Sequence, residues 1–132
     1  MAPPKSTGVE DFNLAWLGQF DVERLDPGDV QATLAELTAR SIADNVRRYA
    51  ARASELNACG GGVHNADLIT RLRRNLPETM VSSTADVGLD PDWVEAVAFA
   101  WLAMRTMGGL AGNLPSVTGA SRKVVLGTIH SP

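Results

Sequence analysis

Two short β-forming segments on either side of a helical segment constrain the fold of this chain more than any other feature. Residues 55–59 are predicted to form a short buried strand that runs into three glycines, and residues 79–83 form a second strand after a proline. The segment between them, 65–75, places leucine and isoleucine on one face, which predicts an amphipathic helix. A strand, a helix and a strand with this spacing predict a right-handed parallel crossover.

Three further helices are predicted at 10–19, 29–53 and 90–107, and residues 124–129 are a candidate third strand. The fold class is therefore α/β, with a small, mostly parallel sheet of two to three strands packed with four helices. Parallel sheets normally contain more strands and are covered on both faces. We therefore expect further strands to come from a partner chain or from sequence outside these residues.

The longest predicted helix should begin at Asp26 or Asp29, either of which can cap its first turn. The helix that follows residue 90 should begin at Pro91, because proline suits the first helical position. The longest predicted helix rests on apolar residues that recur near helical spacing, with alanine at many of the other positions; these residues are Val30, Leu34, Leu37, Val46 and Tyr49.

Composition excludes several classes of protein. The 132 residues carry 12 basic and 15 acidic side chains and no basic block, which argues against nucleic acid as the main partner. One cysteine, Cys59, excludes an internal disulfide framework and a cysteine-based zinc site. The most apolar run, Trp93–Met104, is interrupted by Glu95 and is too short to cross a membrane, and the first residues lack the apolar stretch of a signal peptide. We expect a single domain over residues 1–132, without a metal site, in the cytoplasm.

The strongest local signal for a ligand is the run Gly60, Gly61 and Gly62, followed by Asn65 as a predicted helix N-cap. Glycines let a backbone approach a ligand closely, and free N–H groups at a helix start attract anions, phosphate above all. The run lacks the Gly-Lys-Ser/Thr of a Walker A loop, and Asn65 stands where the third glycine of G-x-G-x-x-G belongs. Phosphate binding and a tight turn without a ligand are therefore equally supported.

Glu95 is the second candidate, because it lies on a helix that is apolar nearly all round and is therefore predicted to be buried. A buried carboxylate should be paired or line a cleft; alternatively, Glu95 benefits from the helix dipole and points to solvent. His64 lies near Cys59, but no nearby acidic residue completes a triad or a ligand set, so a simply buried strand-end cysteine and a histidine at a helix start are favoured. The three arginines of residues 71–74 are interpreted as a solvated helix face.

Five separated segments, taken in order, resemble the C-terminal part of the anhydro-N-acetylmuramic acid kinase family, within the actin, sugar-kinase and heat-shock-ATPase superfamily. The resemblance runs essentially from end to end of the chain, and the combination of segments makes it specific. The segments are Pro4–Gly8, Phe12–Leu17, Cys59–Asn65, Glu95–Ala103 and Gly112–Ala120.

The resemblance implies one of two ribonuclease-H-like lobes that enclose ATP. It also implies a reaction of peptidoglycan recycling, in which 1,6-anhydro-N-acetylmuramic acid is opened hydrolytically and phosphorylated to N-acetylmuramic acid 6-phosphate, with ATP and Mg²⁺ as donor. It places Gly60, Gly61 and Gly62 on the adenosine-side glycine motif, with Asn65 closing that loop, and Glu95 on a glutamate expected to face the sugar. Three other polar residues lie in matching segments without an assigned role: Lys5, Ser6 and Asn13.

Three parts of the family pattern are absent from this sequence: the N-terminal glycine-rich phosphate loop, the segment with the general-base aspartate, and the three opening strands of the second lobe. The resemblance therefore implies that residues 1–132 are the C-terminal part of the second lobe, with no catalytic residue in this chain. We expect the isolated chain to be inactive, because phosphoryl transfer requires groups from both lobes. The alternatives are a non-catalytic binding or scaffold module that forms a homodimer or binds a partner through its open sheet edge, and a split enzyme whose N-terminal lobe is a separate chain.

Overall fold

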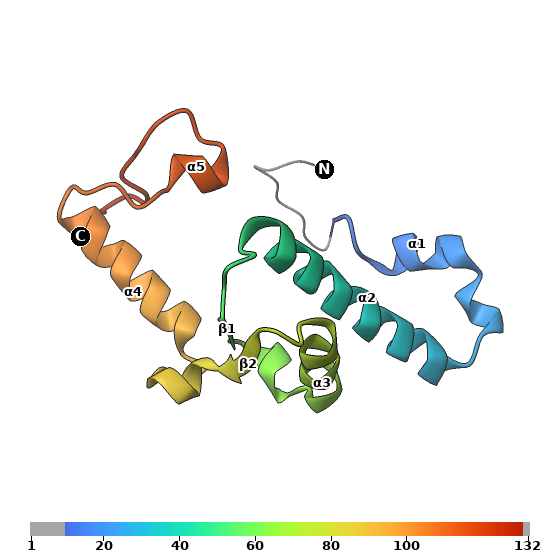
Figure 1. Ribbon diagram of the computed structural model, residues 1–132. Coiled ribbons are helices and arrows are strands. Elements are labelled where there is room, and N and C mark those ends of the chain that lie inside the picture. Colours follow the sequence, from blue (N-terminus) through green and yellow to red (C-terminus); the bar gives the residue numbers. More distant parts are fainter. Residues whose placement is uncertain (1–9, 131–132) are drawn as a thin grey trace. The chain divides into compact units, whose positions relative to one another are not determined.

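The computed structural model describes residues 10–130 of the chain (Figure 1). The chain divides into two compact units, one formed by Phe20–Glu95 and the other by Met1–Gln19 together with Ala96–Pro132. The segment Pro4–Gly8, which includes Lys5 and Ser6 of the resemblance, lies outside the described residues. The expectation of one functional domain over the whole chain stays a prediction.

Helix α2, Pro27–Tyr49, is the longest element of the first unit. It begins where expected, because the Oδ1 atom of Asp26 accepts hydrogen bonds from the N–H groups of Gly28 and Asp29, at 2.8 and 3.3 Å. Pro27 occupies the first turn, where the missing N–H group costs nothing. The helix is preceded by a short 3₁₀ turn, η2 (Val22–Arg24).

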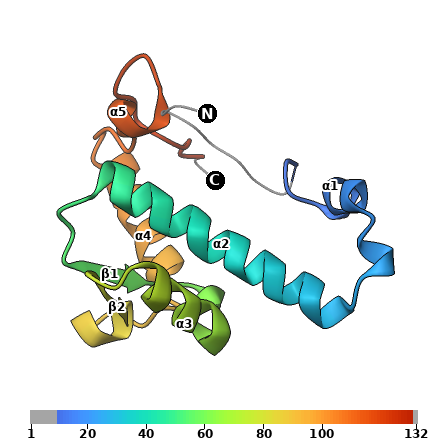
Figure 2. The same cartoon turned by 45° about the vertical axis from the view of Figure 1, so that its right-hand side comes forward.

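The predicted crossover is present and parallel. Strand β1, Glu55–Ala58, pairs with β2, Met80–Ser83, in a two-stranded sheet. Helix α3, Ala66–Asn75, connects them and lies beside α2 in both views (Figures 1 and 2). Strand β1 is not buried as expected, since its residues alternate between exposed and half-buried.

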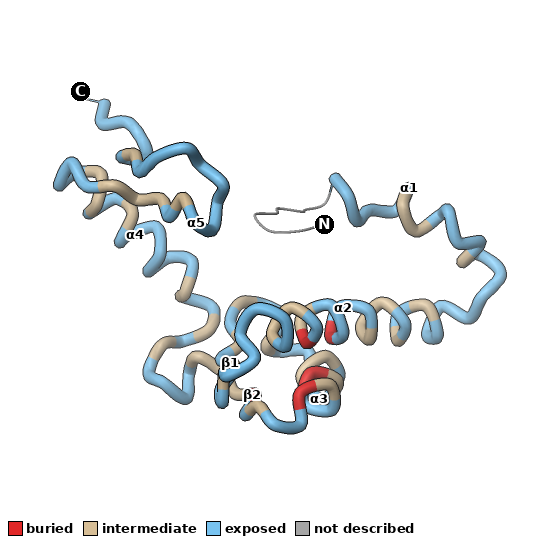
Figure 3. The backbone as a smooth tube through the Cα atoms, turned by 45° about the horizontal axis from the view of Figure 1, so that its top comes forward, coloured by how far each residue is buried: buried red, intermediate tan, exposed pale blue. Residues whose placement is uncertain are grey.

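The core of this unit is small and lies where α2 packs against α3 and β2. Its buried residues are Ala39 and Ala43 of α2, Leu72 and Leu76 at the end of α3, and Val81 of β2; the red positions in Figure 3 mark this region. The two alanines lie one helical turn apart and are fully buried. Small side chains on the contact face let two helices approach closely.

The apolar residues that recur along α2 therefore form only part of its contact face. Leu37 and Tyr49 are 45% and 49% exposed, whereas the alanines form the contact and Val46 packs only partly against the core. The hydrophobic pattern missed this because alanine differs little from its neighbours in hydropathy, although its small volume decides which face can touch a second helix.

Arg73 lies at the outer edge of β2 and is exposed, as predicted for a solvated arginine face; that prediction is wrong for Arg71, which is 21% exposed and pairs with Glu36 and Asp67. The Nε and Nη2 atoms of Arg73 both donate to the carbonyl oxygen of Val81, at 3.3 and 3.2 Å. The neighbouring Met80 N–H donates toward the β1 side, to the Ser54 carbonyl, so the Val81 carbonyl faces away from β1. An edge whose carbonyl is occupied is a poor template for another strand. In the part of the chain that the structure describes, β1 therefore has the open edge.

A 3₁₀ turn, η4 (Thr84–Val87), follows β2 and is held by a capping box. The Ser83 side chain accepts from the Ala85 N–H, while the Asp86 carboxylate accepts from the Ser83 N–H at 3.1 Å. This arrangement satisfies donors that a short helix would otherwise leave free. It carries the chain toward α4 without a long loop.

The second unit contains short helices and irregular segments. Helix α1, Leu14–Leu17, continues into the 3₁₀ turn η1, Gly18–Phe20, and helix α5 spans Pro115–Thr118. The candidate third strand at 124–129 is wrong: residues 121–130 contain no strand, although the Val124 carbonyl accepts a hydrogen bond from the Gly112 N–H.

Helix α4, Val94–Met107, contradicts the expectation of a buried helix. None of its residues is buried, and Phe99 and Met107 are 70% and 80% exposed. It begins at Val94 rather than at Pro91, because the preceding residues form turns. Among the described residues, no helix is long and apolar enough to cross a membrane.

Candidate functional site

The glycine run forms a 3₁₀ turn, η3 (Gly61–His64), between β1 and α3. Gly60 has φ +72° and ψ −176°, a region that is essentially restricted to glycine. The turn is closed by the Val63 N–H donating to the Gly60 carbonyl and the Asn65 N–H donating to the Gly62 carbonyl, at 3.1 and 3.2 Å. The chain therefore has a backbone reason for a glycine at position 60.

Gly61 has no such reason. It does not adopt a positive φ, and a Cβ atom built there meets no other atom within 4 Å. At Gly62 the added atom makes only an ordinary contact, 3.7 Å from a Leu68 methyl carbon. Neither strain nor crowding within the described chain explains the absence of a side chain at Gly61. An open backbone of this kind suits close approach by a ligand.

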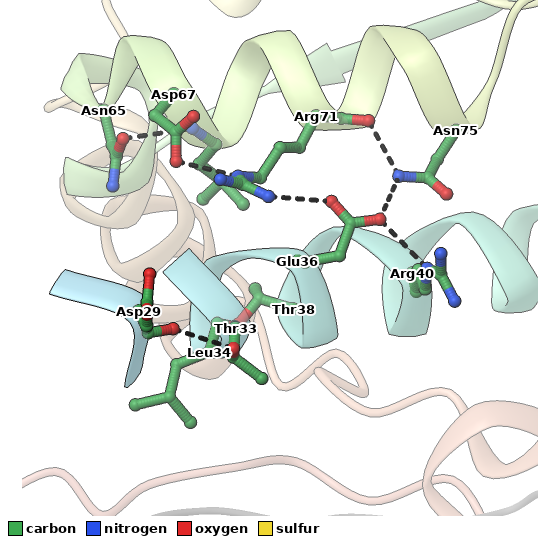
Figure 4. A network of polar contacts seen from close by, with 11 residues as sticks. Asp29, Thr33, Leu34, Glu36, Thr38, Arg40, Asn65, Asp67, Arg71 and Asn75 are labelled. Atoms are coloured by element: carbon green, nitrogen blue, oxygen red, sulfur yellow. Dashed lines mark hydrogen bonds and ion pairs between the residues drawn. The ribbon is translucent and has the colours of Figure 1, made fainter. Parts of the chain in front are cut away.

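Asn65 has the predicted role of N-cap of α3. Its Oδ1 atom accepts a hydrogen bond from the Leu68 N–H at 3.0 Å (Figure 4). Its side-chain NH₂ group forms no hydrogen bond within the described residues and is exposed, so its two N–H donors are left beside the loop. The same side chain therefore both caps the helix and offers a donor to a ligand.

A pairing that the sequence did not reveal lies beside the loop. The Nε2 atom of His64 lies 3.0 and 3.1 Å from the two carboxylate oxygens of Asp92. The sequence did not reveal this partner, because it lies 28 positions away and the turns before α4 bring it back. The pair alone completes neither a triad with Cys59 nor a metal-ligand set among the described residues. Cys59 follows β1 and is exposed rather than buried.

Two carboxylates change the electrostatics of the loop. Asp67 lies in the first turn of α3 and Asp92 lies at the far side of the loop, with 59% and 57% of their side chains exposed. Two negative charges oppose the attraction that a helix start exerts on an anion. Asp67 is partly compensated by Arg71, whose Nε donates to it at 2.8 Å. The loop thus suits a neutral, hydrogen-bonding part of a ligand better than a phosphate group.

Glu95 is not brought into this arrangement by any contact. It lies in the first turn of α4, is exposed, and forms no hydrogen bond or ion pair within residues 10–130. The position agrees with the alternative of a carboxylate that points to solvent near a helix start. A role toward a sugar stays a prediction.

A polar network joins α2 to α3 (Figure 4). The Glu36 carboxylate accepts from Arg40, Arg71 and Asn75, at 2.9, 3.1 and 3.2 Å. These donors, first of all Asn75 and then the two arginines, lower the pKa of Glu36 to about 2, and hydrogen bonds to Asp67 and Glu36 raise the pKa of Arg71.

The sequence pattern does not indicate this network, because its members lie up to 39 positions apart. A surface hollow of about 600 Å³ lies over this face of α2 and includes Glu36, Arg40 and Arg71 in its lining. Each of these charged side chains is hydrogen-bonded to another one. The network therefore joins two helices and leaves none of the three without a partner. No cluster of three metal-ligating side chains exists among the described residues.

Comparisons with known proteins agree with the resemblance. A family model for anhydro-N-acetylmuramic acid kinase matches residues 1–132. An anhydro-N-acetylmuramic acid kinase of Thiobacillus denitrificans is 56% identical over 135 residues, covering 97% of this chain and 35% of that protein. Those of Shewanella halifaxensis and Coxiella burnetii are 49% and 50% identical, covering 98% and 97% of this chain and 36% and 35% of their own lengths. The chain thus spans about a third of the length of these curated relatives.

Proposed function

This chain belongs to the anhydro-N-acetylmuramic acid kinase family, and from that premise we propose that it forms part of an ATP-dependent sugar kinase. The complete enzyme opens 1,6-anhydro-N-acetylmuramic acid hydrolytically and phosphorylates it to N-acetylmuramic acid 6-phosphate, in peptidoglycan recycling. Residues 1–132 are the C-terminal part of its second lobe. Its use of ATP places the enzyme in the bacterial cytoplasm.

The open backbone at Gly61 is the observation that carries the nucleotide role of this chain. Gly60 shapes the turn, while Gly61 and Gly62 leave its surface free of side chains. Asn65 supplies a donor at the same place. With two carboxylates nearby, these groups fit the adenosine part of ATP, whose base and ribose carry hydrogen-bonding groups without charge.

ATP supplies the phosphoryl group in this reaction, and Mg²⁺ accompanies it in the complete enzyme. Within the described residues, no group of three metal-ligating side chains is present. We assign the phosphate and metal contacts to the glycine-rich phosphate loop that the family resemblance implies. In this division of work, residues 60–65 bind and orient the nucleoside. Glu95 is the candidate residue for the sugar, because an exposed carboxylate can accept hydrogen bonds from sugar hydroxyl groups.

Two measurements test this function on the chain as it stands. With the anhydro sugar, ATP and Mg²⁺, a coupled assay for ADP should show no turnover; turnover by this polypeptide contradicts the assignment of the chemistry to other segments. In NMR spectra, millimolar adenosine should shift the amide signals of Gly60, Gly61 and Gly62, while an equal amount of inorganic phosphate should shift them less. An unchanged loop in adenosine contradicts the nucleotide role.

A binding or scaffold module is the second candidate, favoured by the exposed apolar residues of α4 and by the open edge of β1. Phe99 and Met107 are largely exposed, and β2 is the only strand partner of β1 among the described residues. Unpaired edges and exposed apolar side chains promote association. Light scattering coupled to size-exclusion chromatography distinguishes the two candidates, since a scaffold of this kind runs as a homodimer and a monomer argues against it.

A further inference from the structure

The glycine loop is held from two directions. Toward α3, the Asn65 N–H donates to the Gly62 carbonyl. Toward the turn that precedes α4, the Gly60 N–H donates to the Pro91 carbonyl at 2.9 Å. His64 and Asp92 form a second contact beside that bond, and the Asp92 N–H is itself held by the Asp90 carboxylate at 2.9 Å. The loop and the turn before α4 are therefore joined by one backbone and one side-chain contact.

We propose that His64 and Asp92 are a positioning pair that holds the Gly60–Gly62 backbone in its open shape. The two side chains are 61% and 57% exposed, and exposed pairs contribute about 0–1 kcal/mol to global stability. The effect of the pair is therefore local. It restrains a loop whose first residue, Gly60, has a backbone conformation that residues other than glycine rarely adopt. Neither residue needs to touch the ligand to do this.

The contact does not depend on the charge of the imidazole. A neutral ring with its proton on Nε2 and a charged ring both donate from Nε2 to the carboxylate. A glutamine at position 64 carries an amide nitrogen at a similar distance along its side chain, so it can keep the donor without the ring. This gives a conservative variant that separates the hydrogen bond from the shape of histidine.

Amide hydrogen exchange of the nucleotide-free chain tests the pair. In His64→Ala and Asp92→Ala, the amides of Gly60 and Val63, which donate to the carbonyl oxygens of Pro91 and Gly60, should exchange roughly two- to fivefold faster than in the wild type, the range that an exposed pair permits. The double variant should be no faster than either single one, because both remove the same contact. Asp44→Ala is the matched control, since it removes another exposed ion pair, with Arg47, on α2, and it should leave the loop unchanged.

The rescue variant decides between positioning and simple packing. His64→Gln should restore slow exchange at Gly60 and Val63, whereas a purely structural role of the ring would leave it as fast as in the alanine variant. Exchange in Asp92→Ala that equals the control overturns the proposal, and so does a failure of the glutamine to rescue. Unfolding midpoints of all variants should stay near the wild type, because the pair is exposed.

This proposal rests on the proposed function only for the identity of the ligand, and the two can fail separately. Adenosine is added to the same samples, and Asp92→Ala should weaken the shifts at Gly61 by a factor similar to its effect on exchange. If the wild-type loop ignores adenosine while the exchange effects hold, the nucleotide role fails and the pair stands. If adenosine shifts the loop equally in both proteins and exchange is unchanged, the pair fails and the nucleotide role stands.

Discussion

Replacing two adjacent glycines by alanine should have opposite consequences, although the sequence shows no difference between them. Gly60 has a backbone conformation with φ +72° and ψ −176°, whereas Gly61 lies in the 3₁₀ turn without a positive φ. Both have open space where a Cβ would lie. Any loss of stability in Gly60→Ala therefore comes from backbone strain and not from a clash.

The size of the effect follows from this strain. A non-glycine residue in so sparsely populated a region costs about 1–3 kcal/mol. At Gly61 alanine fits without strain and restricts the unfolded chain, which stabilises a protein by about 0.4–1 kcal/mol. The two variants should therefore differ by roughly 1–4 kcal/mol in free energy of unfolding. For domains of about this size, each kcal/mol shifts the unfolding midpoint by several degrees.

Urea unfolding followed by circular dichroism gives the stability difference, and adenosine titration by NMR gives the functional one. Gly60→Ala should unfold at lower urea concentration. Gly61→Ala should unfold at or above the wild-type midpoint and yet respond less to adenosine, because its methyl group enters the space left open for the ligand. Equal destabilisation by both variants would refute the reasoning, since it would mean that Gly61 is required by the fold itself.

Three further predictions concern the helices. Hydrogen-bond donors lower the pKa of Glu36 from its ordinary value of 4.5 to about 2. The stabilising effect of this carboxylate is therefore complete above pH 4.5 and is lost as the pH falls toward 2. Glu36→Gln should flatten that part of the curve of stability against pH, and an unchanged curve contradicts the network. Ala43→Leu should cost about 1–3 kcal/mol by overpacking the contact between α2 and α3, measured by urea unfolding, with Leu37→Ala at an exposed position as a milder control. Asn65→Ala should lose about 1 kcal/mol with the cap, while Asn65→Asp should keep the cap and lose only the response to adenosine; equal losses of stability contradict the double role.

Features set by neighbouring residues were predictable from the sequence. Asp26 and Asn65 cap their helices as expected, because an N-cap depends on a side chain and on N–H groups two or three positions later. The parallel pairing of β1 with β2 followed from the length of the segment between them. The glycine run was identified for the same reason, since a strand, a turn and a helix start are contiguous in the chain.

Features that depend on distant residues were missed. The partner of His64 lies 28 positions away, and the Glu36 network joins two helices. The alanine contact of α2 was missed because hydropathy reports the transfer of a side chain from water and not the distance at which two helices can pack. Burial of α4 was predicted from its apolar composition and is wrong. Composition indicates how much free energy a helix gains when its apolar side chains are covered, but not whether this chain supplies the residues that cover them.

The acidic residues around the glycine loop support a third interpretation beside the two that the sequence left equal. A helix start that faces solvent with free N–H groups favours phosphate, but Asp67 and Asp92 place negative charge on either side of it. A turn without a ligand leaves the glycine at position 61 unexplained, because nothing in the described chain crowds it. A neutral ligand surface satisfies both observations. The nucleoside part of ATP has such a surface. The Asp92 carboxylate, whose charge weakens phosphate binding, is also the group that contacts His64 beside the loop.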